Sequence, residues 1–227
     1  MKPKAIAHRG YSGTEPENTL LAFQKAVDVN CDGIELDVHK TADNQVIVFH
    51  DLEIEIEPRK KVQISSLTLL EIKSIDLPKN QKIPTLKEVL NLIDKKCLVN
   101  IELKGNNTEK LVVQIIRDFV ANKNWKYSDF LVSSFKPDML LTMQSIDTKI
   151  QLGIITDINL EQAIDFAQAN HLFSIHPNHK TLNHQEIKRI QATGIKIFAW
   201  TANEILDIKL LSDMGVDGII SDFPDRI

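Results

Sequence analysis

The chain alternates short apolar runs with longer stretches of helical hydrophobic spacing, and this alternation constrains the fold more than any other feature. Such an order is typical of βα units that build a parallel sheet. The predicted strands are Lys4–His8, Gly33–Val38, Val46–Phe49, Leu98–Leu103, Phe130–Ser133, Ile150–Ile154, Leu172–Ile175, Ile195–Trp200 and Gly218–Ser221. The predicted helices are Asn18–Val29, Thr85–Ile93, Thr108–Asn122, Pro137–Gln144, Leu160–Gln168, Asn183–Ala192 and Ile205–Met214, with N-caps expected at Thr85, Asn183 and Asn203.

The number of these strands predicts a closed barrel. If Val46–Phe49 extends the second unit, the chain contains about eight βα units, the number that closes a TIM (β/α)8 barrel. An internal repeat supports closure, because CDGIELD at Cys31–Asp37 recurs as VDGIISD at Val216–Asp222. We therefore expect one α/β domain over residues 1–227, with a small loop or hairpin insertion at about residues 51–80.

A doubly wound open sheet is the competing α/β architecture. Such sheets usually carry a glycine-rich nucleotide-binding turn directly after the first strand. Here the first strand is followed by HRGYSG, and the acids Glu15 and Glu17 then come where a phosphate would bind. The sequence therefore favours the closed barrel.

Composition and charge exclude several classes of function. Hydrophobic residues make up 43% of the chain, which is enough for a core, while a net charge of −4 with scattered Lys and Arg argues against nucleic-acid binding. The N-terminus lacks the apolar segment of a signal peptide, and we expect no stable membrane anchor. Cys31 and Cys97 form no CxxC pattern, which indicates buried, reduced thiols and a cytoplasmic location.

Two acids stand inside a predicted buried strand. Glu35 and Asp37 are two residues apart, so both side chains point to the same face of the strand. A buried pair of carboxylates repels itself unless a cation compensates it. Glu102 adds a third acid near the end of another predicted strand. Three hard oxygen ligands suit one divalent cation, Mg²⁺ or Ca²⁺, better than zinc.

The ends of the predicted strands also carry histidines and cations. Two histidines, His8 and His50, can supply a general acid and a general base, although the sequence does not say which is which. Three carboxylates around a divalent ion leave one negative charge, and Arg9 and Lys104 add two positive ones. The balance leaves room for one monoanionic group such as a phosphodiester.

The remaining acids and histidines are expected to have ordinary roles. Asp51 is expected to orient His50, and Asp222 to support the site or to fix a turn. The HPNH segment has the composition of a metal cluster, but its proline and asparagine indicate a loop. The histidines expected outside the site, the first two of them partly exposed, are His39, His171, His176, His179 and His184.

A set of ordered motifs covers essentially the whole chain. The motifs are HRG at His8–Gly10, PENT at Pro16–Thr19, GIELDV at Gly33–Val38, VFHD at Val48–Asp51, IPTLKEVL at Ile83–Leu90, NIELK at Asn100–Lys104, SSF at Ser133–Phe135, AWTAN at Ala199–Asn203 and GVDGIISDFP at Gly215–Pro224. Together they resemble the glycerophosphodiester phosphodiesterase family. The resemblance implies a TIM barrel that hydrolyses small glycerophosphodiesters to sn-glycerol 3-phosphate and an alcohol with a divalent metal. It also implies roles for Glu35, Asp37 and Glu102 as metal ligands, His8 and His50 as the acid/base pair, Arg9 and Lys104 as phosphate contacts, and Trp200 as a substrate contact.

One segment departs from the pattern of the family. After the HD of its motif the family commonly continues with an arginine and paired threonines, whereas this chain reads LEIEIEPRKKVQISSLTLLEI from Leu52 to Ile72. This departure leaves the preferred alcohol open. The sequence also leaves open the choice between Mg²⁺ and Ca²⁺ and the oligomeric state. Two other functions remain as alternatives. One is a catalytically silent barrel that binds glycerophosphodiesters, and the other is a lysophospholipase D with an apolar rim or membrane anchor.

Overall fold

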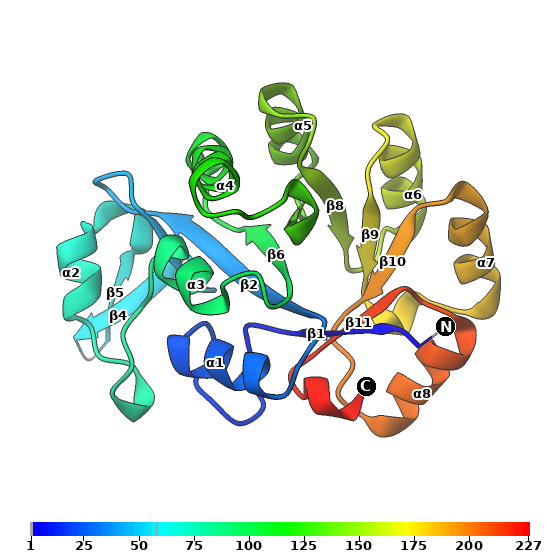
Figure 1. Ribbon diagram of the computed structural model, residues 1–227, viewed down its shortest axis with the longest axis horizontal. Helices are drawn as coiled ribbons and strands as arrows, with labels where there is room; N and C mark the ends of the chain where they lie inside the picture. The colour runs from blue at the N-terminus through cyan, green and yellow to red at the C-terminus, as the bar shows by residue number, and fades with distance from the viewer. Residues whose placement is uncertain (1, 58) are drawn as a thin grey trace.

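Parallel strands alternate with helices and close into a barrel (Figure 1). The computed structural model describes residues 2–57 and 59–227. The barrel strands are β1 (Lys4–Ala7), β2 (Gly33–Lys40), β6 (Leu98–Leu103), β7 (Phe130–Ser134), β8 (Gln151–Thr156), β9 (Ser174–Pro177), β10 (Lys196–Ala199) and β11 (Gly218–Ser221). Because β1 pairs in parallel with both β2 and β11, the sheet has no free edge there. The predicted TIM barrel is confirmed.

Amphipathic helices cover the outside of this sheet. They are α1 (Leu20–Asp28), α3 (Leu86–Ile93), α4 (Glu109–Asn122), α5 (Pro137–Ile146), α6 (Leu160–Ala169), α7 (His184–Thr193) and α8 (Ile205–Met214). In α3 the buried residues are Leu86, Val89, Leu90 and Ile93, which is the spacing of one helix face. Each helix therefore presents one apolar stripe to the sheet.

Two of the three predicted N-caps are confirmed. The Thr85 and Asn183 side chains accept hydrogen bonds from the first turns of α3 and α7. The prediction for Asn203 was wrong, because α8 begins at Ile205 and Glu204 occupies the cap position. Asn203 is engaged by the end of β11 instead, where its side-chain oxygen accepts hydrogen bonds from the Asp222 backbone N–H and the Ser221 hydroxyl.

The segment between β2 and α3 adds structure at one side of the barrel. Strand β3 (Val46–Val48) pairs antiparallel with β2 and so extends the second unit, as predicted. It is followed by a hairpin of β4 (Glu53–Glu57) and β5 (Lys60–Gln63) and by the short helix α2 (Leu69–Ser74), which the sequence analysis did not predict. Figure 1 shows these elements beside α3, and they bury their own small apolar cluster.

The internal repeat flanks the first strand on both sides. Its two copies are the strands β2 and β11, and each is preceded by an aspartate that binds the neighbouring strand. Asp32 accepts a 2.8 Å hydrogen bond from the Ala5 N–H, and Asp217 accepts one of 2.9 Å from the Ile197 N–H. The residues shared by the two copies therefore fasten the barrel, whereas Glu35 and its counterpart Ile220 differ.

The inside of the barrel has an apolar floor. Ile6, Leu131, Phe198 and Ile220 are buried in a cluster separate from the one between the sheet and the helices. Space here is tight, since a Cβ at Gly218 would lie 2.5 Å from the Phe198 ring. Polar side chains occupy the inward positions above this floor, toward the C-terminal ends of the strands.

The sequence analysis expected reduced cysteines and no stable membrane anchor. Cys31 and Cys97 are free thiols, as predicted, although Cys97 is only half-buried. Within residues 2–57 and 59–227, each helix is too short or too polar to cross a membrane.

We predict that Thr85→Ala lowers the free energy of unfolding by about 1 kcal/mol, the usual effect of losing an N-cap. Thr85 accepts a 3.2 Å hydrogen bond from the Glu88 N–H, and the Glu88 carboxylate accepts one of 2.6 Å from the Thr85 N–H. Urea denaturation measures the change. Thr85→Ser retains the hydroxyl and should stay within a few tenths of a kcal/mol of the parent protein, and equal losses in both variants would contradict the capping role.

Candidate active site

A cavity of about 240 Å³ opens at the C-terminal ends of the barrel strands. The residues that line it are His8, Arg9, Glu35, His50, Asn100, Glu102, Lys104, Phe135, Ile155, His176, Trp200 and Ile220. The set contains every predicted site residue except Asp37, whose carboxylate is buried beside those of Glu35 and Glu102. Strand direction explains the convergence, because parallel strands in a barrel all end at the same face.

Three buried carboxylates meet beside this cavity. Oxygen atoms of Glu35, Asp37 and Glu102 lie within 4.8 Å of one another. Burial, together with repulsion from Asp37 and Glu102, raises the pKa of Glu35 well above its usual range, and burial and Asp37 raise the pKa of Glu102. Among the described residues, Glu35 Oε1 has no hydrogen-bond partner. The geometry fits a divalent cation, which would bind the carboxylate oxygens and relieve their repulsion.

Neighbouring groups fix the orientation of each acid. Asn18 donates a 2.9 Å hydrogen bond from Nδ2 to Asp37, and the Arg9 backbone N–H donates one of 3.0 Å to Glu35. Lys104 Nζ lies 2.7 Å from Glu102 and 3.6 Å from Asp37. The sequence analysis gave Asn18 no role, although it stands in the PENT motif.

The two cationic side chains, Arg9 and Lys104, are held in place by carboxylates. Arg9 Nη1 donates 2.9 Å hydrogen bonds to both oxygens of Glu17, and Arg9 Nε lies 3.4 Å from Asp37. Burial lowers the pKa values of Arg9 and Lys104, but the facing carboxylates outweigh it and raise both. Both side chains therefore stay charged at neutral pH. Glu17, which the predicted charge balance left out, neutralises part of the Arg9 charge.

The two histidines of the prediction each contact one aspartate. His8 Nδ1 lies 2.6 Å from Asp222, whose carboxylate also accepts hydrogen bonds from Asn203 (2.6 Å) and Ser12 (3.0 Å). Although burial acts in the other direction, the hydrogen bond with His8 lowers the pKa of Asp222 to about 2. An ionised carboxylate accepts only, so the proton of neutral His8 lies on Nδ1 and Nε2 carries the lone pair.

His50 is oriented by two nearby residues. Its Nδ1 lies 2.7 Å from Asp51, in accord with the predicted orienting role of Asp51, and its carbonyl oxygen lies 3.1 Å from His39 Nε2. His39 was expected to be partly exposed, which was wrong. Strand β2 continues to Lys40, so His39 shares the inward face of Asp37 and is buried. Burial lowers the pKa of His39, and the neutral ring donates to the His50 carbonyl.

His176 was expected outside the site, but it lines the cavity. The predicted strand stopped at Ile175, whereas β9 runs from Ser174 to Pro177 and directs His176 inward. The other two histidines of this region are not among the residues that line the cavity. His179 lies 3.5 Å from Asp207, and His184 is the first residue of α7. Among the described residues, the group of side chains placed to hold a metal ion is the acidic one of Glu35, Asp37 and Glu102.

Aromatic side chains form one wall of the cavity. Trp200 packs edge to face against Phe135 with 5.6 Å between ring centroids, and its Nε1 donates a 2.7 Å hydrogen bond to the His176 carbonyl. Lys104 lies over the Phe135 ring at 5.5 Å. A half-open outer groove continues from this place toward the β4–β5 hairpin, and His50 and Lys104 line both spaces.

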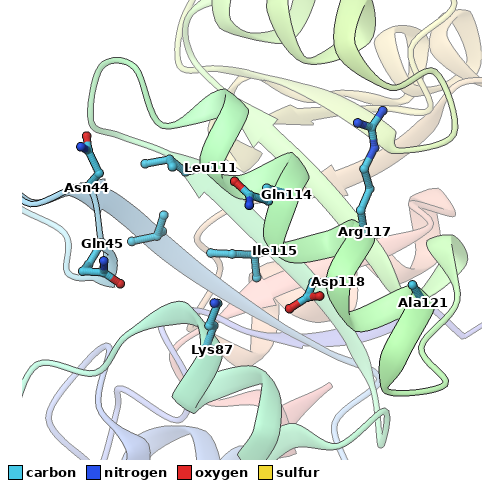
Figure 2. A pocket seen from close by; sticks show the side chains of 10 residues that line it. Asn44, Gln45, Lys87, Leu111, Gln114, Ile115, Arg117, Asp118 and Ala121 are labelled. Atoms are coloured by element: carbon cyan, nitrogen blue, oxygen red, sulfur yellow. The ribbon is translucent and has the colours of Figure 1, made fainter.

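A second hollow lies on the outer surface between α3 and α4 (Figure 2). Its volume is about 470 Å³, and Figure 2 shows Lys87 on one side of it and Ile115 and Asp118 on the other. Arg117 on the same helix is already bound to Asp147 through a 2.7 Å hydrogen bond. In the part of the chain that the structure describes, no buried polar side-chain atom along this hollow lacks a partner. The hollow therefore carries none of the features that mark the barrel cavity.

Comparison with known proteins agrees with this geometry. Residues 8–226 match the Glycerophosphoryl diester phosphodiesterase family. The chain belongs to this family. Membership assigns it to the hydrolases that cleave glycerophosphodiesters.

Individual members of the family show the extent of the similarity. A glycerophosphodiester phosphodiesterase of Caldanaerobacter subterraneus is 31% identical over 240 residues, which cover 100% of this chain and 97% of the relative. A lysophospholipase D of Mus musculus is 27% identical over 98% of this chain and 84% of its own. The structure of an Oleispira antarctica phosphodiesterase in complex with the product sn-glycerol-3-phosphate has a TM-score of 0.87 and 26% identity, covering 100% of this chain and 95% of that one.

We predict that Mg²⁺ or Ca²⁺ stabilises this phosphodiesterase, and does so more at about pH 8 than at about pH 5. The raised pKa values of Glu35 and Glu102 mean that the metal-free folded state keeps protons that the unfolded chain has lost. Its stability therefore falls as pH rises through those values, whereas cation binding to the ionised acids offsets the fall. At one hundred times Kd the gain is about 2.7 kcal/mol.

Thermal unfolding with and without chelator, repeated at each pH, measures this difference. Glu35→Gln removes one ligand and serves as the control, because its melting temperature should no longer respond to the cation. A cation effect that is equal at both pH values would contradict the assignment of the acids as ligands.

Proposed function

We propose that this protein hydrolyses small glycerophosphodiesters to sn-glycerol 3-phosphate and an alcohol in a metal-dependent reaction. One observation carries the proposal. Three buried carboxylates converge within 4.8 Å beside a cavity whose lining includes His8 and His50, each hydrogen-bonded to an aspartate through Nδ1. The Oleispira antarctica relative, with its bound sn-glycerol-3-phosphate, supports the same product for this chain.

The acids are the ligands in this proposal. Glu35, Asp37 and Glu102 would hold one divalent cation, and their hard oxygen atoms suit Mg²⁺ or Ca²⁺. When bound, such a cation polarises phosphoryl oxygens and neutralises charge that develops on them. Lys104, which lies between these acids and the outer groove, adds a fixed positive charge for the phosphate. Arg9, whose guanidinium Glu17 and Asp37 hold in place, is the second proposed phosphate contact, and its backbone N–H also orients Glu35.

The phosphate belongs where the two spaces meet. His50 and Lys104 line both the enclosed cavity and the outer groove, so a phosphodiester between them would send one substituent into each space. We assign the glycerol end to the enclosed cavity, where the small volume of about 240 Å³ and the Trp200 wall fit a three-carbon group. The open groove of about 580 Å³ then accommodates alcohols of differing size.

The different surroundings of His8 and His50 suit them to different roles in proton transfer. Asp222 is half-buried, with 28% of its side chain exposed, and the bonds from Asn203 and Ser12 fix it beside His8. His8 is therefore the general base, because this carboxylate stabilises the imidazolium that forms when Nε2 takes the proton of the attacking oxygen. His50 lies toward the outer groove and donates the proton to the leaving alcohol.

We expect His8→Ala and His50→Ala each to lower kcat at least about a hundredfold, the usual contribution of a general acid or base. The assay follows release of glycerol 3-phosphate from glycerophosphocholine, glycerophosphoethanolamine and glycerophosphoglycerol. Chelation should abolish turnover, and each of Mg²⁺ and Ca²⁺ is then restored separately. Glu102→Gln should not recover with either ion.

The same assay separates the alternatives. A silent binding barrel would bind these diesters without releasing glycerol 3-phosphate. A lysophospholipase D would prefer lysophospholipids over the deacylated diesters. Full activity in either histidine variant would contradict the role given to that histidine.

We predict that Asp222→Asn lowers kcat far more than Asp51→Asn, although both aspartates contact a histidine Nδ1. Asp51 has 70% of its side chain exposed, so water screens its charge and can replace its hydrogen bond to His50. Asp222, by contrast, is held in a partly buried hydrogen-bond network. We expect a loss of at least about tenfold for Asp222→Asn and less than threefold for Asp51→Asn. Steady-state kinetics measures both, and equal losses would refute the unequal contributions of the two aspartates.

A further inference from the structure

Buried polar atoms without partners gather at the cavity. Among the described residues, six buried side-chain nitrogen or oxygen atoms make no hydrogen bond. Five of the six residues line the enclosed cavity, namely Arg9, Glu35, Asn100, Glu102 and His176. The proposed function accounts for the two acids and for Arg9, and two of these atoms, Arg9 Nε and Glu102 Oε1, also lie in ion pairs. Of these five residues, the neutral ones, Asn100 and His176, are left without an explanation. Buried polar groups in native proteins are normally hydrogen-bonded.

His176 differs from the other groups in its electrical surroundings. Burial alone lowers its pKa to about 3, and no charge among the described residues contributes to the shift. The ring is therefore neutral throughout the pH range of an enzyme assay and is no acid, base or phosphate-binding cation. It stands on β9, on the opposite side of the barrel from β2 with Glu35 and Asp37, and its carbonyl oxygen accepts the hydrogen bond from Trp200.

The orientation of the imidazole is fixed from one side. Nε2 lies 2.9 Å from the Ser174 hydroxyl, two residues earlier on β9. A Cβ at Gly153 would lie 2.6 Å from Nε2 and 3.1 Å from Cδ2, so this edge of the ring packs against β8. Nδ1 belongs to the opposite edge, which faces away from β8. The glycine leaves room for the ring, and the serine sets its rotation.

We propose that His176 Nδ1 hydrogen-bonds the terminal hydroxyl of the glycerol group and thereby selects glycerol esters over other phosphodiesters. The inference rests on the proposed function, which places glycerol in the enclosed cavity. A neutral donor or acceptor among apolar walls suits a neutral hydroxyl, and that hydroxyl is the part of the glycerol group farthest from the phosphorus. His176 is thus a specificity residue rather than an acid or base.

A substrate pair tests the contact directly. The p-nitrophenyl ester of sn-glycerol 3-phosphate carries the terminal hydroxyl, and the corresponding ester of propane-1,2-diol phosphate lacks only that group. We expect the parent enzyme to prefer the glycerol ester about ten- to a hundredfold in kcat/KM, because the deoxy substrate leaves a buried polar group unpaired. In His176→Leu this preference should fall to less than about threefold, mainly through a higher KM for the glycerol ester.

Two further variants separate the contact from packing. Asparagine places its amide atoms close to the position of Nδ1, whereas glutamine places them close to Nε2. His176→Asn should therefore keep most of the preference for the glycerol ester, and His176→Gln should lose it. Each preference is a ratio measured on one enzyme preparation, so a fraction of unfolded protein cancels.

The outcomes distinguish this inference from the function on which it rests. If the parent enzyme hydrolyses neither ester while properly loaded with metal, the proposed function fails. If it hydrolyses both esters equally well, or if His176→Leu retains the full preference, the hydroxyl contact is refuted and the phosphodiesterase function stands. Equal preferences in the asparagine and glutamine variants would also refute it.

Discussion

Repulsion among three buried carboxylates is the constraint around which the site is organised. Around Glu35 and Glu102, desolvation and the charge of the neighbouring carboxylates both oppose ionisation. Lys104 and Arg9 relieve part of this repulsion, but their own contacts leave Glu35 Oε1 without a partner among the described residues. Such a cluster lowers the stability of the metal-free fold, and a bound cation would offset this loss.

Much of the fold could be predicted from local pattern alone. Alternation of strand and helix, with one repeat that brackets the first strand, is sufficient to specify a closed barrel. Side-chain parity along a strand depends only on neighbouring residues, so the shared face of Glu35 and Asp37, and of Asn100, Glu102 and Lys104, follows from spacing. The hairpin was one of two options for its segment, and α2, which packs on a cluster of its own, was not predicted.

The missed residues depend on contacts that no local pattern reveals. Pro177 indicated a loop, yet it ends β9, and its presence there concealed the inward position of His176. Asn203 has the residue type and place of an N-cap, but a partner on β11 engages its side chain. His39 looked exposed because the predicted strand ended two residues too early, at Val38 instead of Lys40. In each case a strand end or a long-range partner outweighed a sound local preference.

The two histidines show how sequence distance and function are linked in this barrel. His50 and Asp51 are neighbours in the chain, so their contact needs little of the fold. His8 and Asp222 are 214 residues apart and meet only where the first and last strands pair. The proposed base is therefore oriented only when β1 and β11 close the barrel. Opening of this seam would disorient His8 at the same time, because closure of the barrel and assembly of the base are the same event.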